Sequence, residues 1–284
     1  MPTLLPLEEA SRRILARASR TAAEEVALAD GLGRVLVQPR IVAPVDVPPF
    51  ANSAMDGFAL RAADTPGVLR LVGEVAAGAA ALPSVTHGTA ARIMTGAPMP
   101  PGADTVVPME LAHEADGVVR LASPTVAGAH VRSSGSDTAA GTEVCLEEAL
   151  TPAALGVLAT LGFGRIQVRR RPVVAVVSTG DELVEPGLPL GPGQIYNSNG
   201  VAVAAAVEEA GGEPLILGRL ADDSDRIERA LLDAARQADL IVTSGGVSVG
   251  VYDYVRQVLE RIGALDFWRV AVQPGKPLAV GELG

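Results

Sequence analysis

The sequence predicts a multi-domain protein of the α/β plus β class: a doubly wound, mostly parallel α/β domain, an N-terminal helical region and an inserted small β domain. Three observations support this fold class. Apolar runs alternate with helical patterns over residues 171–284, glycine and proline punctuate short apolar runs over 46–138, and helical patterns flank that stretch. Alternating strands and helices favour a parallel sheet with right-handed crossovers, whereas short punctuated strands are typical of a small β domain.

The first expected element is an amphipathic helix near the N-terminus. Leu7, Ala10 and Ile14 recur at helical spacing, with acidic residues in the first turn and arginines later. This charge order suits the helix dipole, and the apolar stripe gives the helix one face to bury. A second short element is expected near residues 28–37.

Helical patterning returns at residues 151–161. Thr151 stands where an N-cap is expected, directly before Pro152 at the first helical position. We expect this helix to pack back against the N-terminal one, which makes the β domain an insertion. The predicted domains are a helical domain of residues 1–45 with 139–170, a β domain of residues 46–138, and an α/β domain of residues 171–284.

The α/β domain begins with a continuous apolar run at residues 173–177. Such a run, bounded by Ser-Thr-Gly, predicts a strand that is buried on both faces. Ligands in these folds gather beyond the carboxyl ends of the strands. The elements expected next are a helix at 198–210, a strand at 215–217, a helix at 225–237, a strand at 240–243, a helix at 252–262 and a strand at 267–272.

Composition excludes several classes of function. The 284 residues carry 33 acidic and 23 basic side chains, for a net charge of −10, which disfavours non-specific binding of nucleic acid. No stretch approaches the roughly 18 apolar residues that span a bilayer, and no targeting segment is recognisable. Cys145 is the only cysteine, which excludes an intrachain disulfide and a multi-cysteine metal site and favours a cytoplasmic location.

A glycine-rich loop follows the strand at 240–243. Three glycines and two serines within residues 244–250 can offer backbone N–H groups and hydroxyls to a phosphate or another oxyanion. The alternative is a turn that needs glycine only for its backbone conformation. The loop matches neither the Walker A nor the dinucleotide-binding pattern.

Acidic residues gather at the same predicted edge of the sheet. Asp181 and Glu182 follow the first strand, Asp222 follows the next, and Asp253 stands behind the glycine loop. Mg²⁺ takes oxygen ligands and shares them with substrate phosphates, so these carboxylates are candidate ligands. Taken singly, each is better explained as a helix cap or turn residue, and it is their convergence on one edge that favours a metal site. Lys276, the only lysine in the chain, is a candidate partner for a bound anion.

Two loops of the β domain also hold polar residues, around Asp56-Gly57 and Thr95-Gly96. By themselves such dipeptides are common turns. The three histidines, His87, His113 and His130, are too scattered for a metal triad, and no Ser/His/Asp spacing is present.

Taken together, these segments resemble the molybdenum-cofactor biosynthesis family MoeA, which includes the E domain of gephyrin. The resemblance is carried, in the family's order, by PPFANSAMDGFAL, IMTGAPMPPGADTVVPME, STGDEL, YNSN, TSGGVSVG and QPGKP. It implies a molybdopterin molybdenumtransferase that uses Mg²⁺ to insert molybdate into adenylylated molybdopterin and releases AMP. It also implies a homodimer, a MogA-like α/β domain, and a MogA-like adenylyltransferase as a partner.

The resemblance assigns roles to residues of this chain. The implied catalytic residues are Asp56, Thr95, Asp137, Glu182, Asp222, Asp253 and Lys276. The implied metal ligands are Asp181, Glu182, Asp222 and Asp253. The implied substrate-binding residues are Ser178, Thr179, Gly180, Asn199, Ser244, Gly245, Gly246, Ser248, Gly250 and Gln273.

Some features depart from the family pattern. Val251 stands where an acidic residue usually follows the glycine loop, and Gln273 stands where many members have lysine. The family's Gly-Asn-Pro loop and C-terminal β domain are expected to lie beyond residue 284. The alternatives are therefore a non-catalytic paralogue, a binding or scaffold module, a tungstate-specific homologue, and a MogA-like molybdopterin adenylyltransferase; the last is disfavoured by the loops at Asp56 and Thr95.

Overall fold

The computed structural model describes residues 4–245, 254–272 and 277–283. The chain forms two compact units, one made of Glu25–Ile166 and the other of the residues on either side of it. One unit holds a β-sheet of its own and the other a parallel sheet with helices, which confirms the predicted fold class. Within the described ranges, no helix is long and apolar enough to cross a membrane.

The unit Glu25–Ile166 is built on a six-stranded sheet in the order β7-β4-β6-β5-β9-β8. Its neighbouring strands are antiparallel, except for β5 and β6, which are parallel. Between β8 and β9, Asp116 and Gly117 have φ angles of 51° and 74°, as the tight turns of hairpins require. The strands are β4 (Gly57–Leu60), β5 (Gly67–Val75), β6 (Thr89–Ile93), β7 (Thr105–Pro108), β8 (Ala112–Ala115) and β9 (Val118–Leu121).

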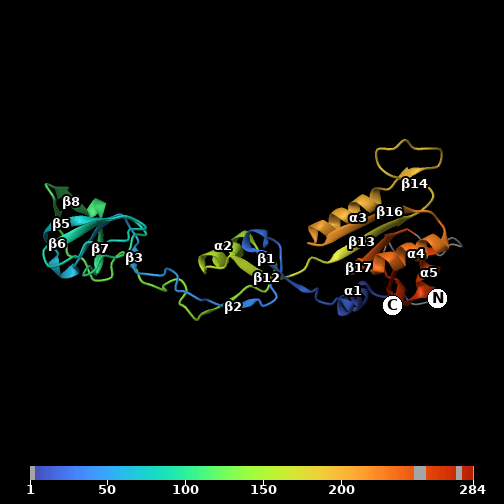
Figure 1. The fold of residues 1–284 in the computed structure, drawn as a ribbon, viewed down its shortest axis with the longest axis horizontal. Coiled ribbons are helices and arrows are strands. Elements are labelled where there is room, and N and C mark those ends of the chain that lie inside the picture. Colours follow the sequence, from blue (N-terminus) through green and yellow to red (C-terminus); the bar gives the residue numbers. More distant parts are fainter. Residues whose placement is uncertain (1–3, 246–253, 273–276, 284) are drawn as a thin grey trace. The chain divides into compact units, whose positions relative to one another are not determined.

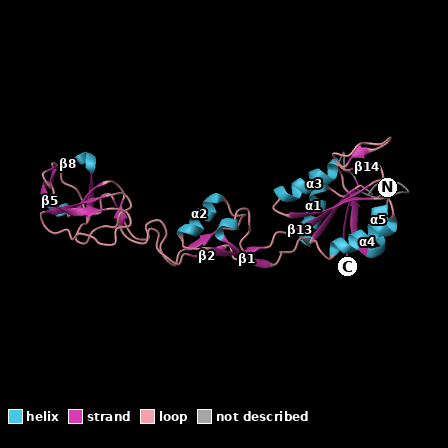
Figure 2. Cartoon of the chain, turned by 45° about the horizontal axis from the view of Figure 1, so that its top comes forward, coloured by secondary structure: helices cyan, strands magenta, loops and turns pink. Residues whose placement is uncertain are grey.

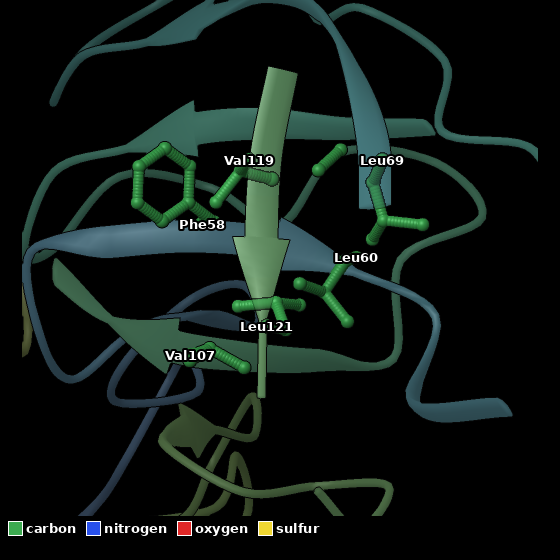
Figure 3. Packing of buried hydrophobic residues seen from close by; sticks show 7 residues of the cluster. Phe58, Leu60, Leu69, Val107, Val119 and Leu121 are labelled. Atoms are coloured by element: carbon green, nitrogen blue, oxygen red, sulfur yellow. The ribbon is translucent and has the colours of Figure 1, made fainter. Parts of the chain in front are cut away.

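Both faces of this sheet are covered. Successive residues of a strand point to opposite faces, and β4 accordingly places Phe58 and Leu60 in one core cluster and Ala59 in another. Figure 3 shows the first cluster, in which Phe58 and Leu60 pack with Leu69, Val107, Val119 and Leu121. This core gives the loops at the strand ends a rigid frame.

Shorter elements complete the unit. In α2 (Pro152–Thr160), the predicted N-cap is confirmed: the Thr151 side chain accepts a hydrogen bond from the Ala154 N–H at 3.2 Å. The 3₁₀ helices are η1 (Leu28–Asp30), η2 (Ala62–Asp64) and η3 (Met109–Leu111). The paired short strands are β3 (Asn52–Ser53) with β10 (Val131–Arg132), β2 (Arg40–Val42) with β11 (Glu143–Cys145), and β1 (Ala23–Ala27) with β12 (Arg165–Arg169).

A parallel sheet in the order β16-β13-β17 forms the centre of the other unit. Its middle strand is buried along almost its whole length, as the apolar run predicts. Figures 1 and 2 place α3 on one side of this sheet and α4 and α5 on the other. The elements are β13 (Val173–Thr179), α3 (Ser198–Glu209), β16 (Glu213–Leu220), α4 (Ser224–Ala235), β17 (Leu240–Ser244) and α5 (Tyr254–Ile262), in the predicted order.

The last predicted strand differs from the structure. The sequence predicts a strand of the parallel sheet at residues 267–272, whereas β18 spans Gly263–Arg269 and pairs antiparallel with β19 (Pro277–Leu283). Because β18 begins directly after α5, there is no connecting loop to carry the chain across to the parallel sheet. The strand therefore pairs with the segment that follows it.

The predicted N-terminal helix is α1 (Leu7–Arg17), and it packs within the α/β unit. Ala10 is 1% exposed and shares a small core with Val270, and the Arg13 Nη1 lies 3.3 Å from Asp266 Oδ1. This helix therefore belongs to the α/β unit, and α2 contacts η1 in the other unit. The packing of α1 against α2 stays a prediction. Within the α/β unit, the apolar side of α1 packs at β18 and β19, around Val270 and Val280.

Candidate functional site

The parallel sheet brings three loops to one edge. In the strand register, Ser178 at the end of β13 stands opposite Arg219 of β16 and Ser244 of β17. The segments that follow these positions carry the acidic pair Asp181 and Glu182, then Asp222, then Gly245. These loops leave the sheet at its carboxyl edge, where the topology predicts a ligand site.

The acidic residues at this edge influence one another. Loss of hydration and then the negative charges of Asp181 and Glu182 raise the pKa of the Asp222 carboxyl above its usual range. The Asp181 backbone N–H partly offsets this rise in the pKa of Asp222, and the Arg219 guanidinium lies 3.7 Å from Asp181 Oδ1. Negative charge is therefore concentrated at the edge and only partly compensated by arginine.

The described part of the chain contains no group of three or more His, Cys, Asp or Glu side chains that could hold a metal ion by themselves. Asp253, the fourth expected ligand, lies outside the described residues, as do five other predicted site residues. These five are Gly246, Ser248, Gly250, Gln273 and Lys276.

A buried polar network lies behind the acidic loop. Ser178 is 1% exposed, and its hydroxyl donates to Asn197 Oδ1 at 2.9 Å. Asn197 caps α3 through a hydrogen bond from the Gly200 N–H at 3.0 Å, and its Nδ2 donates to Glu185 Oε1 at 3.2 Å. Ser178 thus anchors a helix end from within the core, while the predicted Asn199 is exposed in the first turn of α3.

The sequence interpretation missed Asn197 and Glu185. The signal for Asn197 was present in the YNSN motif, because asparagine is among the preferred N-cap residues and stands directly before a helical pattern. Glu185 had no such signal, since its role depends on a contact with a residue twelve positions later.

Thr179 lies between the network and the glycine loop. Its Oγ1 is buried and has no hydrogen-bond partner among the described residues. Gly245, with a φ of +94°, passes so close that a Cβ there would lie 2.7 Å from the Thr179 carbonyl oxygen. Close backbone approach thus requires glycine at position 245, and the Thr179 hydroxyl lies close to this glycine.

In the other unit, Asp56 and Thr95 lie in contact. The Thr95 backbone N–H and hydroxyl both donate to Asp56 Oδ1 at 2.7 Å. These two hydrogen bonds lower the pKa of the Asp56 carboxyl, the backbone bond contributing most. The two loops are also joined by a hydrogen bond from the Gly96 N–H to the Ser53 carbonyl at 2.8 Å. Both site residues remain exposed.

Asp137 has a different environment. The Arg132 guanidinium lies 2.5 Å from its Oδ2, and its backbone N–H donates to the Val47 carbonyl at 2.9 Å. Its carboxylate is therefore already paired with a cation, unlike that of Asp56.

Known proteins similar to the chain were found by sequence and by structure. Residues 5–162 match the family described as "MoeA N-terminal region (domain I and II)", and residues 175–284 match the family described as "Probable molybdopterin binding domain". A molybdopterin molybdenumtransferase of Haemophilus influenzae is 39% identical over 99% of this chain and 70% of its own length. Molybdopterin molybdenumtransferase 2 of Mycobacterium tuberculosis is 42% identical over 86% of this chain and 64% of its own length.

Solved structures give the same result. The crystal structure of the molybdopterin biosynthesis MoeA protein of Pyrococcus horikoshii has a TM-score of 0.83 and 35% identity, over 99% of this chain and 72% of that one. The chain thus matches these proteins over nearly its whole length and spans about two thirds of theirs.

Proposed function

Because the chain belongs to the MoeA family of molybdopterin molybdenumtransferases, we propose that it inserts molybdate into adenylylated molybdopterin and releases AMP with the help of Mg²⁺. Beyond the family relationship, one observation carries this proposal. Three carboxylates follow the carboxyl ends of two neighbouring parallel strands, and the pKa of Asp222 is raised by lost hydration and by the charges of Asp181 and Glu182. Such a cluster favours a divalent cation, which relieves the repulsion between its members.

The donor chemistry of this edge fits Mg²⁺. The ion prefers carboxylate oxygens, and it commonly takes one or two of them together with substrate phosphate oxygens and water. Asp181, Glu182 and Asp222 are the described carboxylates that would hold it. Because substrate oxygens and water complete the coordination, three protein ligands need not converge before the substrate binds. When bound, Mg²⁺ polarises a phosphorus–oxygen bond as a Lewis acid.

The residues of the chain bind and orient the reactants. We propose that the loop at Ser244 and Gly245, with the Thr179 hydroxyl close to it, offers donors to the phosphate of the pterin substrate. Asp56, fixed in place by Thr95, supplies a carboxylate whose low pKa keeps it ionised at neutral pH. Nothing in this arrangement calls for a protein nucleophile, because positioning and charge neutralisation can supply the rate.

Other parts of the proposal have two sources. The family resemblance implies a homodimer, a MogA-like adenylyltransferase partner and anion binding by Lys276. The sequence pattern and cysteine content favour a cytoplasmic location and a division into a helical, a β and an α/β domain. The three-domain division places the boundaries at residues 45/46, 138/139 and 170/171.

The proposal is tested by AMP release from adenylylated molybdopterin with Mg²⁺, with and without molybdate. We expect release that depends on molybdate, and its loss in Glu182→Ala. The matched control is Glu213→Ala, the same change at an exposed position where β16 begins, which should leave the rate unchanged. Absence of molybdate-dependent release in the unmodified protein would instead favour a non-catalytic paralogue.

A further inference from the structure

The two acidic residues of the site lie in a long loop between β13 and α3. After Asp181 and Glu182, the chain forms β14 (Leu183–Val184), makes a loop, and then forms β15 (Ile195–Tyr196), which pairs with β14 in parallel. These two short strands are the stems of the loop. The loop beyond β14 extends away from the sheet (Figure 1). The shape of the acidic turn therefore depends on what holds the two stems of this loop together.

Backbone hydrogen bonds join the stems. The Ile195 N–H donates to the Glu182 carbonyl at 2.8 Å, and the Asn197 N–H donates to the Val184 carbonyl at 2.9 Å. Two-residue strands provide few such bonds, so the stems need further support.

The Asn197 side chain provides this support. It is 4% exposed and connects three segments: Ser178 at the end of β13, Gly200 at the start of α3, and Glu185 directly after β14. An amide is suited to this position because its oxygen accepts two hydrogen bonds while its nitrogen donates to a carboxylate. A carboxylate in its place would face the carboxylate of Glu185.

We propose that Asn197 is a positioning residue for the metal-binding carboxylates: its side chain fixes the β14–β15 pair against β13 and α3, and so holds Asp181 and Glu182 beside Asp222. This inference rests on the proposed function, because it assumes that the acidic edge binds Mg²⁺. The Asp181 backbone N–H and the charges of Asp181 and Glu182 act on the Asp222 carboxyl, so the turn and the next loop are coupled electrostatically. Residues that orient metal ligands in this way commonly change metal affinity by about 10–100-fold when replaced.

The test uses a nearly isosteric change and its reversal. Asn197→Asp keeps the shape and the acceptor oxygens but replaces the donor to Glu185 with a negative charge. Adding Glu185→Gln to this variant restores a donor–acceptor pair with the roles exchanged. Gln194→Glu is the control, since it adds the same charge to the same loop and keeps the acceptor for the Gly191 N–H.

Two measurements are made on each protein: Mg²⁺ binding by calorimetry, and hydrogen exchange of the peptide covering residues 180–197. We expect Asn197→Asp to weaken Mg²⁺ binding about tenfold and to speed exchange in this peptide. The double variant should recover both, and Gln194→Glu should change neither by more than about twofold.

Two results would overturn the inference. One is unchanged Mg²⁺ affinity in Asn197→Asp despite faster exchange, which would give Asn197 a purely structural role. The other is an unmodified protein that binds no Mg²⁺, which would remove the site itself. If instead Mg²⁺ binding follows the expected pattern but no AMP is released, the proposed reaction fails while the positioning role stands.

Discussion

Replacing Gly200 by alanine sets two physical effects against each other. Gly200 lies in the first turn of α3, where alanine has the higher helix propensity, by about 1 kcal/mol. Its Cβ, however, would lie 2.8 Å from Asn197 Nδ2, 2.9 Å from Asn197 Oδ1 and 3.0 Å from Ser178 Oγ. The obstacle is an amide held by hydrogen bonds on three sides, so it cannot swing aside freely.

The magnitude follows from what must move. Displacing the amide breaks two buried hydrogen bonds of about 1 kcal/mol each, and the remaining crowding costs about 1–3 kcal/mol. Once the gain in propensity is subtracted, Gly200→Ala should lower the free energy of unfolding of the α/β unit by about 2–4 kcal/mol. Crowding should therefore outweigh propensity.

The assay is urea unfolding followed for the α/β unit, because two compact units can unfold in separate transitions. Gly156→Ala in α2 is the matched control: it is also a helical glycine, but nothing lies within 4 Å of its added Cβ. This variant should stabilise its own unit by about 0.5–1 kcal/mol. Unchanged or increased stability in Gly200→Ala would show that Asn197 is not held as tightly as the structure indicates, and would refute the reasoning.

Three further predictions concern the core and the two carboxylates. Leu60→Ala should destabilise the β-sheet unit by about 2–5 kcal/mol in urea unfolding. The control is Leu111→Ala, which changes a side chain that is 68% exposed and should cost less than about 0.5 kcal/mol. Equal losses of stability in the two variants would contradict the core assignment. Thr95→Val should raise the pKa of Asp56 toward its ordinary value in an NMR titration. A lowered carboxyl pKa stabilises the folded state at neutral pH, and this stabilisation is lost as the pH falls through that pKa. At neutral pH the variant should therefore have a smaller free energy of unfolding than the unmodified protein, and the difference should shrink in acid. The raised pKa of Asp222 has the opposite sign: its charged form opposes folding as the pH rises above the ordinary carboxyl value. With a chelator present, the free energy of unfolding of Asp222→Asn should therefore exceed that of the unmodified protein increasingly as the pH rises. Mg²⁺ at a hundred times its Kd should raise the free energy of unfolding of the unmodified protein by about 2.7 kcal/mol and leave that of the variant unchanged.

Periodicity predicted most elements of the α/β unit, because each strand there is an apolar run between recognisable stops. The run at residues 173–177 became β13 with its last six residues buried, and Thr151 caps α2 as predicted. What periodicity could not supply was the choice of partner. An amphipathic stripe shows that α1 buries one face, but only the fold shows that this face meets Val270.

For the candidate site too, the sequence predicted which residues lie at the sheet edge but not which side chains contact one another. The sheet order placed Asp181, Glu182 and Asp222 at one edge, because parallel strands end together. The topology could not show that Ser178 faces the core and anchors Asn197, since side-chain direction at a strand end depends on the turn that follows. Asp137 likewise matched a family acid in sequence, whereas its pairing with Arg132 became visible only in the structure.

The docking of α1 onto β18 and β19 has a consequence for synthesis on the ribosome. Arg13 and its partner Asp266 are 253 positions apart. The first helix to be translated therefore cannot make its native contacts until nearly the last described segment has been synthesised. At elongation rates of roughly 5–20 residues per second, that delay is on the order of 10–50 s. Throughout it, the apolar side of the helix around Ala10 has no native surface to cover it, and a nascent chain that stalls within the α/β unit would expose this side to chaperones or to aggregation. Protection of α1 from proteolysis would therefore report that translation has reached β18.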